Sequence, residues 1–363
     1  MLTRIYIDNF RSFVNFEYQP GRRALLLGSN GSGKTSLLDA IRYLKRFVKG
    51  DPNRFTQSTR TRWQDQLTQV IEMEAALDGK SFDYRVEVAF AGPTREPVIQ
   101  LERLKVSGAT AFELSAGRVR FYGDDRSSYT VPLQTSRSVL HLSVLGNPDV
   151  RRFVEWLNHV HCFGIDAYPG TMNEAADSEE FEPDFEMDNL AGWYRHLVQS
   201  YPEENIRFLA SLEECMDGFQ TLKFSSSDED GVRKLRTEFT APGGRRVSYS
   251  LSELSEGQRC LIALYMILHF LISRGDTVFV DEPDNFIALR EIQPWLLAAD
   301  QAVDDHRSQL VLISHHPEIL NQWAADYGVR FFREQNGHVR TEKFRPDEAG
   351  NLQPSDLIAR GWE

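Results

Sequence analysis

Alternating hydrophobic and polar positions dominate the first third of the chain, as in strands whose two faces meet different surroundings. Short runs of this kind, bounded by turn residues, predict strands over residues 2–7, 13–18, 24–27, 70–77, 82–90, 98–106 and 117–122. Asp78-Gly79 lies between two of these strands and is typical of a tight hairpin turn. We therefore expect a β-rich lobe at the N-terminal end.

Helical spacing replaces this alternation in several later segments. Apolar residues at that spacing predict helices over 36–48, from 148 onward, and over 190–216. Residues 219–225 and 235–241 predict a second hairpin, and from residue 255 onward helices alternate with apolar strands, which is typical of an α/β layer. The predicted parts are an N-terminal lobe over 1–147, a helical insertion over 148–218 and a C-terminal lobe over 219–363.

A glycine-rich motif connects the predicted strand 24–27 to the predicted helix 36–48. Its residues, Gly28-Ser29-Asn30-Gly31-Ser32-Gly33-Lys34-Thr35, fit the phosphate-binding pattern G-x-x-x-x-G-K-[ST] and precede Ser36. The amides of the loop would point at the phosphates, at the positive end of the helix dipole. Lys34 would reach the β- and γ-phosphates, and the Thr35 hydroxyl would bind Mg²⁺. A plain glycine turn is the alternative, but the flanking strand and helix favour a nucleotide site over Gly28–Ser36.

Two acidic residues end a later apolar strand, Thr277-Val278-Phe279-Val280-Asp281-Glu282. The carboxyl end of a buried strand reaches the sheet edge where a P-loop lies, so Asp281 can hold Mg²⁺ and Glu282 can act as general base. A second apolar strand over 309–313 precedes His315 and His316. A histidine at that place can touch the γ-phosphate and position water.

A third element lies at the start of a long apolar helix. Leu254-Ser255-Glu256-Gly257-Gln258 precedes the apolar run. The Ser255 hydroxyl and the free amides near Gly257 would form an anion site at the helix N-terminus.

In this order, the P-loop, Leu-Ser-x-Gly-Gln, the strand ending in Asp-Glu, and Ser-His resemble the ATP-binding-cassette (ABC) ATPase superfamily. Asn9-Phe10-Arg11-Ser12-Phe13 resembles a motif of its soluble RecF/SMC-like and OLD-like branch, the AAA_21 type. The resemblance covers the first fifty residues and residues 250–335. It implies an α/β fold, namely a P-loop NTPase with the architecture of an ABC-ATPase head, with ATP and Mg²⁺ as cofactors.

The resemblance also implies roles for single residues. These roles are catalysis by Lys34, Glu282 and His315, Mg²⁺ binding by Thr35 and Asp281, and contact of Arg11 with the nucleotide. His315 is preferred over His316 because it comes first in the family pattern. In this superfamily the partner's signature motif completes the ATP site, so Ser255 and Gly257 would act in trans. The implied assembly is a head-to-tail homodimer with two identical sites.

The chain departs from this branch at two places. Asp284-Asn285 would occupy the D-loop, but residues 286–294 follow where relatives commonly carry His-Pro. The glutamine that often binds Mg²⁺ in the family has no clear position, and Gln134 and Gln69 are the candidates.

Composition narrows the class of protein further. The net charge of −12 opposes global attraction to nucleic acid, so any DNA contact needs a local basic patch. The candidate patches are Arg54, Arg60 and Arg62, and Arg233, Lys234, Arg236, Arg245 and Arg246. Three cysteines without metal-type spacing and a start without a signal-peptide pattern indicate a cytoplasmic protein. The longest apolar run, Ile262–Ile272, is too short to span a bilayer.

Several relatives within the superfamily are disfavoured. In this chain Ser255 follows Lys34 by 221 residues (255 − 34), a longer spacing than in the compact layout of a transporter cassette. A rod-forming protein would need long heptad repeats, which are missing from the sequence. The 48 residues (363 − 315) after His315 are too few for a TOPRIM nuclease domain.

Two roles remain for the ATPase. The first is a switch that controls a separate effector such as a nuclease, as in bacterial anti-phage defence. The second is a RecF-like DNA-binding repair ATPase. The acidic segment 174–188 is either a solvated loop or a docking site for a basic partner, and it favours the first role modestly.

Overall fold

The computed structural model describes residues 1–361 except 52–54, 91–95, 124–126, 134, 142–146, 169, 226–231 and 347–351. The chain forms two compact units. The first comprises Met1–His161 and Tyr327–Arg345, and the second comprises Cys162–Asp326 and Pro346–Trp362. A late segment therefore returns to the N-terminal unit, which no local sequence pattern indicates. The division into three parts predicted from the sequence has other boundaries than these two units, and it stays a prediction.

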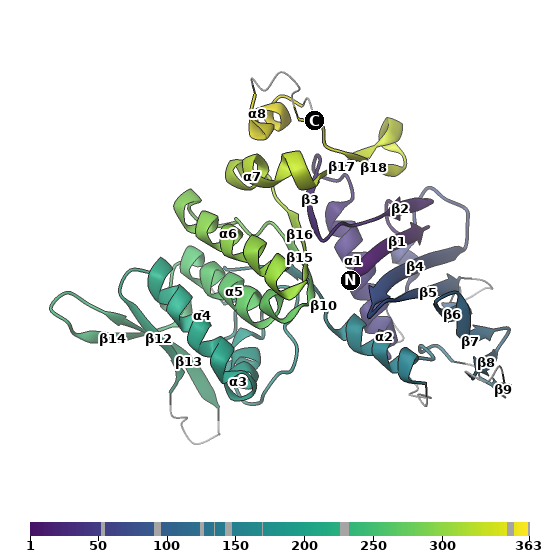
Figure 1. Cartoon of the computed structure of the whole chain (residues 1–363), viewed down its shortest axis with the longest axis horizontal. Coiled ribbons are helices and arrows are strands. Elements are labelled where there is room, and N and C mark those ends of the chain that lie inside the picture. The colour runs from purple at the N-terminus through teal and green to yellow at the C-terminus, as the bar shows by residue number, and fades with distance from the viewer. Residues whose placement is uncertain are drawn as a thin grey trace. The chain divides into compact units, whose positions relative to one another are not determined.

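An antiparallel sheet of eight strands forms much of the first unit (Figure 1). Its strand order is β2-β1-β4-β5-β6-β7-β8-β9. In chain order the strands are β1 (Leu2–Asp8), β2 (Phe16–Tyr18), β4 (Thr68–Leu77), β5 (Lys80–Ala89), β6 (Val98–Val106), β7 (Ala109–Ser115), β8 (Arg118–Tyr122) and β9 (Ser128–Pro132). The predicted β-rich lobe is confirmed, and β7 and β9 are strands that the hydrophobic pattern missed. The predicted strand 13–18 shortens to β2, because Phe10 and Phe13 close a turn through mutual backbone hydrogen bonds of 3.1 and 2.8 Å.

Two-residue turns with left-handed backbone set the register of this sheet. Asp78 and Gly79 have φ of 48° and 79°, as a type I′ turn requires at both central positions. The predicted hairpin around them is therefore confirmed. Ser107-Gly108 and Ala116-Gly117 repeat the positive φ values and begin and end β7. Ser-Gly and Ala-Gly are weaker turn signals than Asp-Gly, which explains why β7 was missed.

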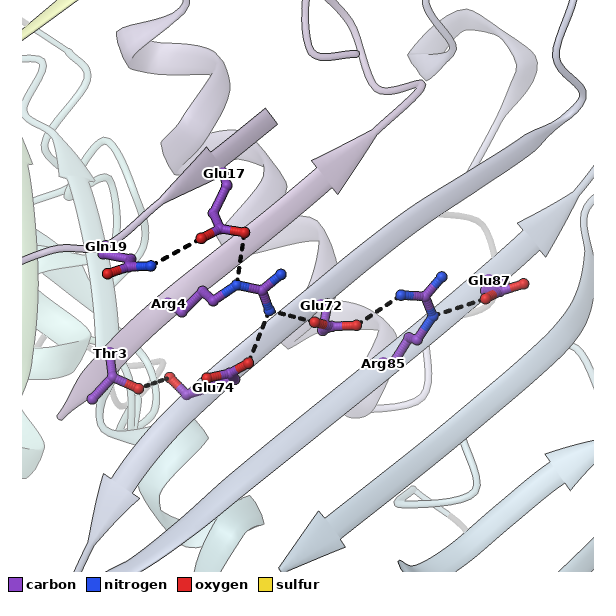
Figure 2. Close-up of polar contacts among 8 residues, drawn as sticks. All are labelled: Thr3, Arg4, Glu17, Gln19, Glu72, Glu74, Arg85 and Glu87. Atoms are coloured by element: carbon purple, nitrogen blue, oxygen red, sulfur yellow. Dashed lines mark hydrogen bonds and ion pairs between the residues drawn. The ribbon is translucent and has the colours of Figure 1, made fainter. Parts of the chain in front are cut away.

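A ladder of ion pairs crosses four neighbouring strands of the sheet (Figure 2). The pairs are Arg4 Nε to Glu17 Oε2 (3.0 Å), Arg4 Nη1 to Glu74 Oε1 (2.9 Å), Arg85 Nη1 to Glu72 Oε2 (2.7 Å), Arg85 Nε to Glu87 Oε1 (2.8 Å), and a contact between Arg4 and Glu72. Burial alone would raise the pKa of Glu72, but hydrogen bonds from Arg4 and Arg85 lower it overall. Since consecutive rungs join β2, β1, β4 and β5, the ladder favours one pairing register.

The remaining part of the first unit surrounds the glycine-rich motif. The strand β3 (Arg23–Leu27) pairs in parallel with β17 (Gly328–Arg333), which pairs antiparallel with β18 (Val339–Lys343). The helix α1 (Lys34–Val48) follows the motif, and Lys45 Nζ donates to the carbonyl of Asn158, 2.7 Å away, at the end of α2 (Pro148–Asn158). Strand, motif and helix therefore follow one another as predicted.

The second unit contains parallel strands and packed helices. Its strands are β10 (Val160–Gly164), which begins in the first unit, β15 (Thr277–Asp281) and β16 (Gln309–Ile313), and its helices are α3 (Leu190–Ser200), α4 (Pro202–Cys215), α5 (Glu256–Phe270), α6 (Leu289–His306), α7 (Pro317–Tyr327) and α8 (Pro354–Ala359). The helices α4, α5 and α6 lie side by side (Figure 1). The indole of Trp295 donates to the carbonyl of Leu264 at 2.9 Å and so ties α6 to the buried α5. None of the helices in the described ranges is long and apolar enough to cross a membrane.

The predicted helix 190–216 is wrong in one respect, since it is two helices. α3 ends at Ser200 and α4 begins at Pro202. Proline has no amide hydrogen and disfavours helical backbone in the residue before it, and Tyr201 has φ −136°.

A small sheet projects from the second unit. The predicted hairpin is confirmed as β12 (Phe219–Phe224) and β13 (Arg233–Thr240), and β13 also pairs with β14 (Arg246–Ser250) and β11 (Ala175–Ala176). The hydrophobic pattern did not predict β14, which is polar, or β11, which has two residues.

One half-buried carboxyl links the segments that follow β15 and β16. The Ser314 hydroxyl donates to Asp284 Oδ1 at 2.6 Å and accepts from the His316 amide at 2.9 Å. Burial raises the pKa of Asp284, and the hydrogen bond from Ser314 opposes that rise only in part. Ionised Asp284 is therefore less favourable in the folded chain than in the unfolded one.

We expect Asp284→Asn to stabilise the protein near pH 7 and to do so less near pH 4. A raised folded-state pKa means that the stability from this carboxyl is complete below its unfolded pKa and is lost as pH rises through the folded pKa. Asparagine keeps an acceptor for Ser314 without the charge, so the variant's advantage should grow with pH to the order of 1 kcal/mol. Urea unfolding at several pH values measures it. The exposed control Asp305→Asn should differ from wild type by less than about 0.5 kcal/mol throughout, and a shrinking advantage would contradict the assignment.

Candidate functional site

The glycine-rich loop of the first unit needs glycine where the backbone turns. Gly28, Gly31 and Gly33 have φ of 126°, 79° and 110°. A Cβ atom on Gly28 would lie 2.1 Å from the carbonyl oxygen of Phe331, so no other residue fits there. α1 begins directly at Lys34, with Gly33 as a cap that offers no side-chain hydrogen bond and with no acidic residue in the first turn. The amides at this helix start are therefore suited to an anion.

Lys34 lies within the loop rather than in solvent. Its side chain is 7% exposed, and Nζ donates to the carbonyls of Gly28 (2.5 Å) and Ser29 (3.2 Å). The buried Ser32 hydroxyl has no hydrogen-bond partner among the described residues. An ammonium group, a hydroxyl and helix-start amides form a donor set that fits the oxygens of a triphosphate. Ser29, Asn30, Gly31 and Thr35 form the exposed rim of this loop.

The hairpin of β17 and β18 supports the loop from behind. Arg333 Nε donates to the carbonyl of Gly31 at 2.8 Å, and Val339 lies where a Cβ on Gly33 would meet it at 3.2 Å. Sequence reasoning missed both residues, because they follow the loop by about three hundred positions and carry no motif.

The Asn9-Phe10-Arg11 segment also belongs to the first unit. Asn9 is fully buried with φ 56°, and its amide donates to the carbonyls of Gln66 (2.8 Å) and Thr68 (3.0 Å). The Arg11 guanidinium pairs with Asp39 on α1 and remains partly exposed. Arg11 is therefore held against the helix that begins at Lys34, and its contact with a nucleotide stays a prediction.

Of the two glutamine candidates for Mg²⁺ binding, Gln69 is engaged by other groups. Gln69 is 1% exposed, its Oε1 accepts from Thr59 Oγ1 (3.0 Å), and its Nε2 donates to the carbonyl of Asn9 (2.9 Å). Its amide thus fastens the β4 strand to the Asn9 segment. Gln134 lies outside the described residues.

In the second unit, the acidic pair follows β15 as the sequence predicts. Asp281 is the last residue of β15 and pairs in register with Ile313. The Glu282 amide donates to the Ile313 carbonyl at 2.8 Å, and Glu282 has φ 50°, which turns the chain sharply after the strand. Its carboxylate accepts from Asn285 Nδ2 at 2.8 Å. Asn285 can therefore orient the predicted general base.

The two histidines after β16 have different surroundings. His316 Nδ1 accepts from the Glu318 amide at 3.3 Å and so caps the start of α7. His315 is exposed. His315 is therefore open to a ligand, and its contact with the γ-phosphate stays a prediction.

Ser255 caps α5 in a reciprocal capping box. Its hydroxyl accepts from the Gln258 amide at 3.2 Å, and its own amide donates to Gln258 Oε1 at 3.0 Å. A Cβ on Gly257 would lie 2.8 Å from the Phe286 carbonyl oxygen, so the signature helix and the predicted D-loop approach closely. Arg259, one turn further along α5, is buried beneath this turn, and sequence reasoning missed it because a charged residue that opens an apolar helix usually faces solvent.

The predicted site residues divide between the two units. Gly28–Ser36 and Arg11 belong to the first, and Ser255, Gly257, Asp281, Glu282 and His315 belong to the second. The predicted metal ligands Thr35 and Asp281 divide in the same way.

Two protein families match separate parts of the chain. Residues 4–117 match AAA_23, described as an AAA domain. Residues 170–321 match AAA_21, described as "AAA domain, putative AbiEii toxin, Type IV TA system". The first match contains the glycine-rich loop, and the second contains the capped helix, the acidic pair and His315.

Curated relatives are described as DNA replication and repair protein RecF. The protein of Shewanella loihica is 25% identical over 249 residues, which are 56% of this chain and 66% of that protein. That of Shewanella sediminis is 28% identical over 162 residues, which are 44% of this chain and 39% of that protein. The chain thus spans less than two thirds of the length of these relatives.

Solved structures of SMC heads share the fold. The SMC head domain from Thermotoga maritima has a TM-score of 0.50 at 15% identity and covers 95% of this chain and 99% of its own. An SMC head bound to the C-winged helix domain of ScpA has a TM-score of 0.57 at 14% identity, with 96% and 99% coverage. These likenesses confirm the predicted α/β fold of an ABC-ATPase head. Together with the two family matches and the RecF relatives, they support the predicted resemblance to the RecF/SMC-like ATPases of the ABC superfamily.

Proposed function

We propose that the chain binds ATP with Mg²⁺ and hydrolyses it in a site shared by two copies of the chain. The observation that carries ATP binding is the loop around Gly28, where a left-handed backbone without room for a Cβ presents Lys34 and the helix-start amides together. An oxygen-rich anion can take the place of the Gly28 and Ser29 carbonyls around the Lys34 ammonium group.

The proposed chemistry is in-line attack of water on the γ-phosphate. Thr35 and Asp281 would hold Mg²⁺, which supplies positive charge to the phosphates. Glu282 accepts the proton of the attacking water, and His315 positions that water. Lys34 stabilises the negative charge that develops on the phosphate oxygens.

The proposed sharing between copies follows from the contents of one chain. Each chain has one glycine-rich loop and one capped signature helix, so a two-fold pair forms two identical sites. Ser255 and Gly257 of one copy complete the γ-phosphate site of the other. Because ATP held by one copy contacts the signature helix of the other, dimerisation in this arrangement depends on ATP.

For the biological role we favour a switch that controls a partner effector, a nuclease of bacterial anti-phage defence. The description of the AAA_21 family, which names a toxin of a toxin–antitoxin system, supports a defence role. The SMC head that binds ScpA shows that a head of this fold can carry a partner protein. The acidic segment 174–188 adds a surface, since Phe181 within it is 75% exposed and His196 and Gln199 hold the neighbouring Glu179.

A RecF-like role in DNA repair is the second candidate, which the RecF relatives support directly. Arg233, Lys234, Arg245 and Arg246 are exposed on β13, β14 and the turn between them, and have no ion pair within the described part of the chain. In the other candidate patch, Arg60 donates to the carbonyls of Gln64 and Gln66, and Arg54 lies outside the described residues. The projecting hairpin is therefore the better candidate for phosphate contacts.

Glu282→Gln should bind ATP normally, hydrolyse it about 10²- to 10⁴-fold more slowly, and accumulate as an ATP-bound dimer, because the general base is lost. Single-turnover hydrolysis and size exclusion with ATP measure the two effects. The exposed Glu214→Gln in the same unit should behave as wild type. A monomeric Glu282→Gln protein in saturating ATP would contradict the shared site.

Ser255→Arg should lower kcat by about 100-fold and leave nucleotide affinity within about twofold, because the large side chain blocks only the signature half. Mixing it with Lys34→Ala protein should restore up to about a quarter of wild-type activity, since half of the dimers then hold one intact site of two. ATPase assays of the mixture against each variant alone decide this. No recovery on mixing would remove the support for sharing in trans.

The two roles predict different companions for ATP-trapped Glu282→Gln protein. The switch role predicts a nuclease that co-purifies with it from the native host and leaves wild-type protein after hydrolysis. The repair role predicts salt-sensitive binding of duplex DNA that Arg245→Glu with Arg246→Glu weakens about 10-fold or more. Arg118→Glu with Arg120→Glu on β8 is the control of equal charge change. DNA binding that responds equally to both pairs would argue against a hairpin site.

A further inference from the structure

Arg259 is a buried cation without an anionic partner in the described chain. Its side chain is 2% exposed, and it lies in the first turn of α5, four residues after Ser255. The guanidinium donates to four backbone carbonyls: Ala167 (2.9 Å), Leu251 (3.2 Å), Ser252 (3.4 Å) and Leu254 (2.9 Å). A buried charge of this kind is tolerated only where the geometry of its hydrogen bonds is good.

Three of these carbonyls belong to the turn that leads into Ser255. Leu251, Ser252 and Leu254 direct their oxygens inward to the same guanidinium, so the turn is wound around a single planar group. Lysine could not reproduce this fork, because its ammonium group is a compact donor on a flexible stem. The position of the Ser255 hydroxyl therefore depends on Arg259 as well as on its capping box.

The fourth carbonyl extends the contact to the predicted D-loop. Ala167 precedes Tyr168, whose ring lies edge-on to Phe286 with centroids 5.1 Å apart. The Phe286 carbonyl in turn faces Gly257, where a Cβ would come within 2.8 Å. Contacts therefore lead from Arg259 through Ala167-Tyr168 and Phe286 back to Gly257, which lies on the same helix as Arg259.

We infer that Arg259 is a positioning residue that holds the signature turn and the Phe286 segment as one rigid block and so sets Ser255 for the γ-phosphate of the other copy. This inference deepens the proposed function and rests on it. Arg259 itself is buried beneath the signature turn, where its Nε and Nη1 donate to backbone carbonyls, so it acts through the turn. Its loss should therefore affect catalysis by the partner's site and not the binding of ATP to its own loop.

The test compares kcat with nucleotide affinity in Arg259→Met. We expect kcat to fall by about 10- to 100-fold, because a displacement of about 1 Å at a catalytic group has effects of this size. The dissociation constant for a fluorescent ATP analogue should change by less than about twofold. Arg195→Met is the matched control, because that half-buried arginine on α3 also donates to backbone carbonyls, those of Ala176 (3.2 Å) and Asp177 (3.0 Å), and should keep wild-type kcat.

Mixing locates the defect in one half of the site. Arg259→Met with Lys34→Ala should recover up to about a quarter of wild-type activity, because the mixed dimer pairs the intact loop of one chain with the intact signature of the other. Ser255→Arg with Lys34→Ala runs in parallel. If activity recovers in the Ser255→Arg mixture but not in the Arg259→Met mixture, only the role of Arg259 is overturned. If neither mixture recovers activity, the shared site is overturned, and the inference with it.

Two further variants cover misfolding and coupling. If Arg259→Met does not fold, Arg259→Lys keeps the charge and should show an intermediate kcat with the same recovery on mixing. Tyr168→Ala should lower kcat as well, and its combination with the Arg259 variant should be less than additive, because both act through one block. Wild-type kcat in the folded Arg259 variants, or full additivity with Tyr168→Ala, overturns the inference.

Discussion

The close approach of Gly28 to the backbone of β17 is the constraint on which the first unit depends. The absence of a Cβ lets β3 and β17 remain paired, with Leu25 to Leu27 opposite Gly328 to Arg330, right up to the point where the chain leaves the sheet. The loop then starts from a fixed position, and α1 begins directly at Lys34 after a glycine cap that offers no side-chain hydrogen bond. Because Arg333 also holds the outer part of the loop through the Gly31 carbonyl, a segment late in the chain determines the shape of a motif near its start.

Two buried cations of the described residues, Lys34 and Arg259, show how similar chemistry serves two purposes. Lys34 donates to two loop carbonyls and lies beside an exposed rim, so phosphate oxygens can compete for its ammonium group. Arg259 donates to four carbonyls through Nε and Nη1 and is 2% exposed, so its guanidinium is closed to a ligand from solvent. The number of partners and the exposure of their surroundings, rather than the charge itself, distinguish a ligand-binding residue from a positioning residue.

Local physics explains which parts of the fold could be predicted from the sequence. The loop around Gly28, the turn at Asp78-Gly79 and the cap at Ser255 each depend on a few adjacent residues, and all three form the expected local structure. β11 and the return of residues 327–345 depend on pairing between distant segments, which single-sequence periodicity does not record. The role of Arg259 could not be predicted for a related reason. Its four acceptors are backbone carbonyls, which every sequence contains, so no residue type marks them.

The capping geometry of Ser255 explains why this hydroxyl suits a phosphate supplied from outside its own unit. As a cap it uses an acceptor lone pair for the Gln258 amide, which leaves its hydrogen to donate. Gln258 occupies the Ser255 amide, so the donors that remain at the helix start are the hydroxyl and the first-turn amides near Gly257. Ser255 is exposed, and the partners holding this turn, Arg259 and the Phe286 segment, lie in the same unit. A group that is rigidly supported from behind and open in front binds an incoming anion without rearrangement, which is what a site completed by a second copy requires.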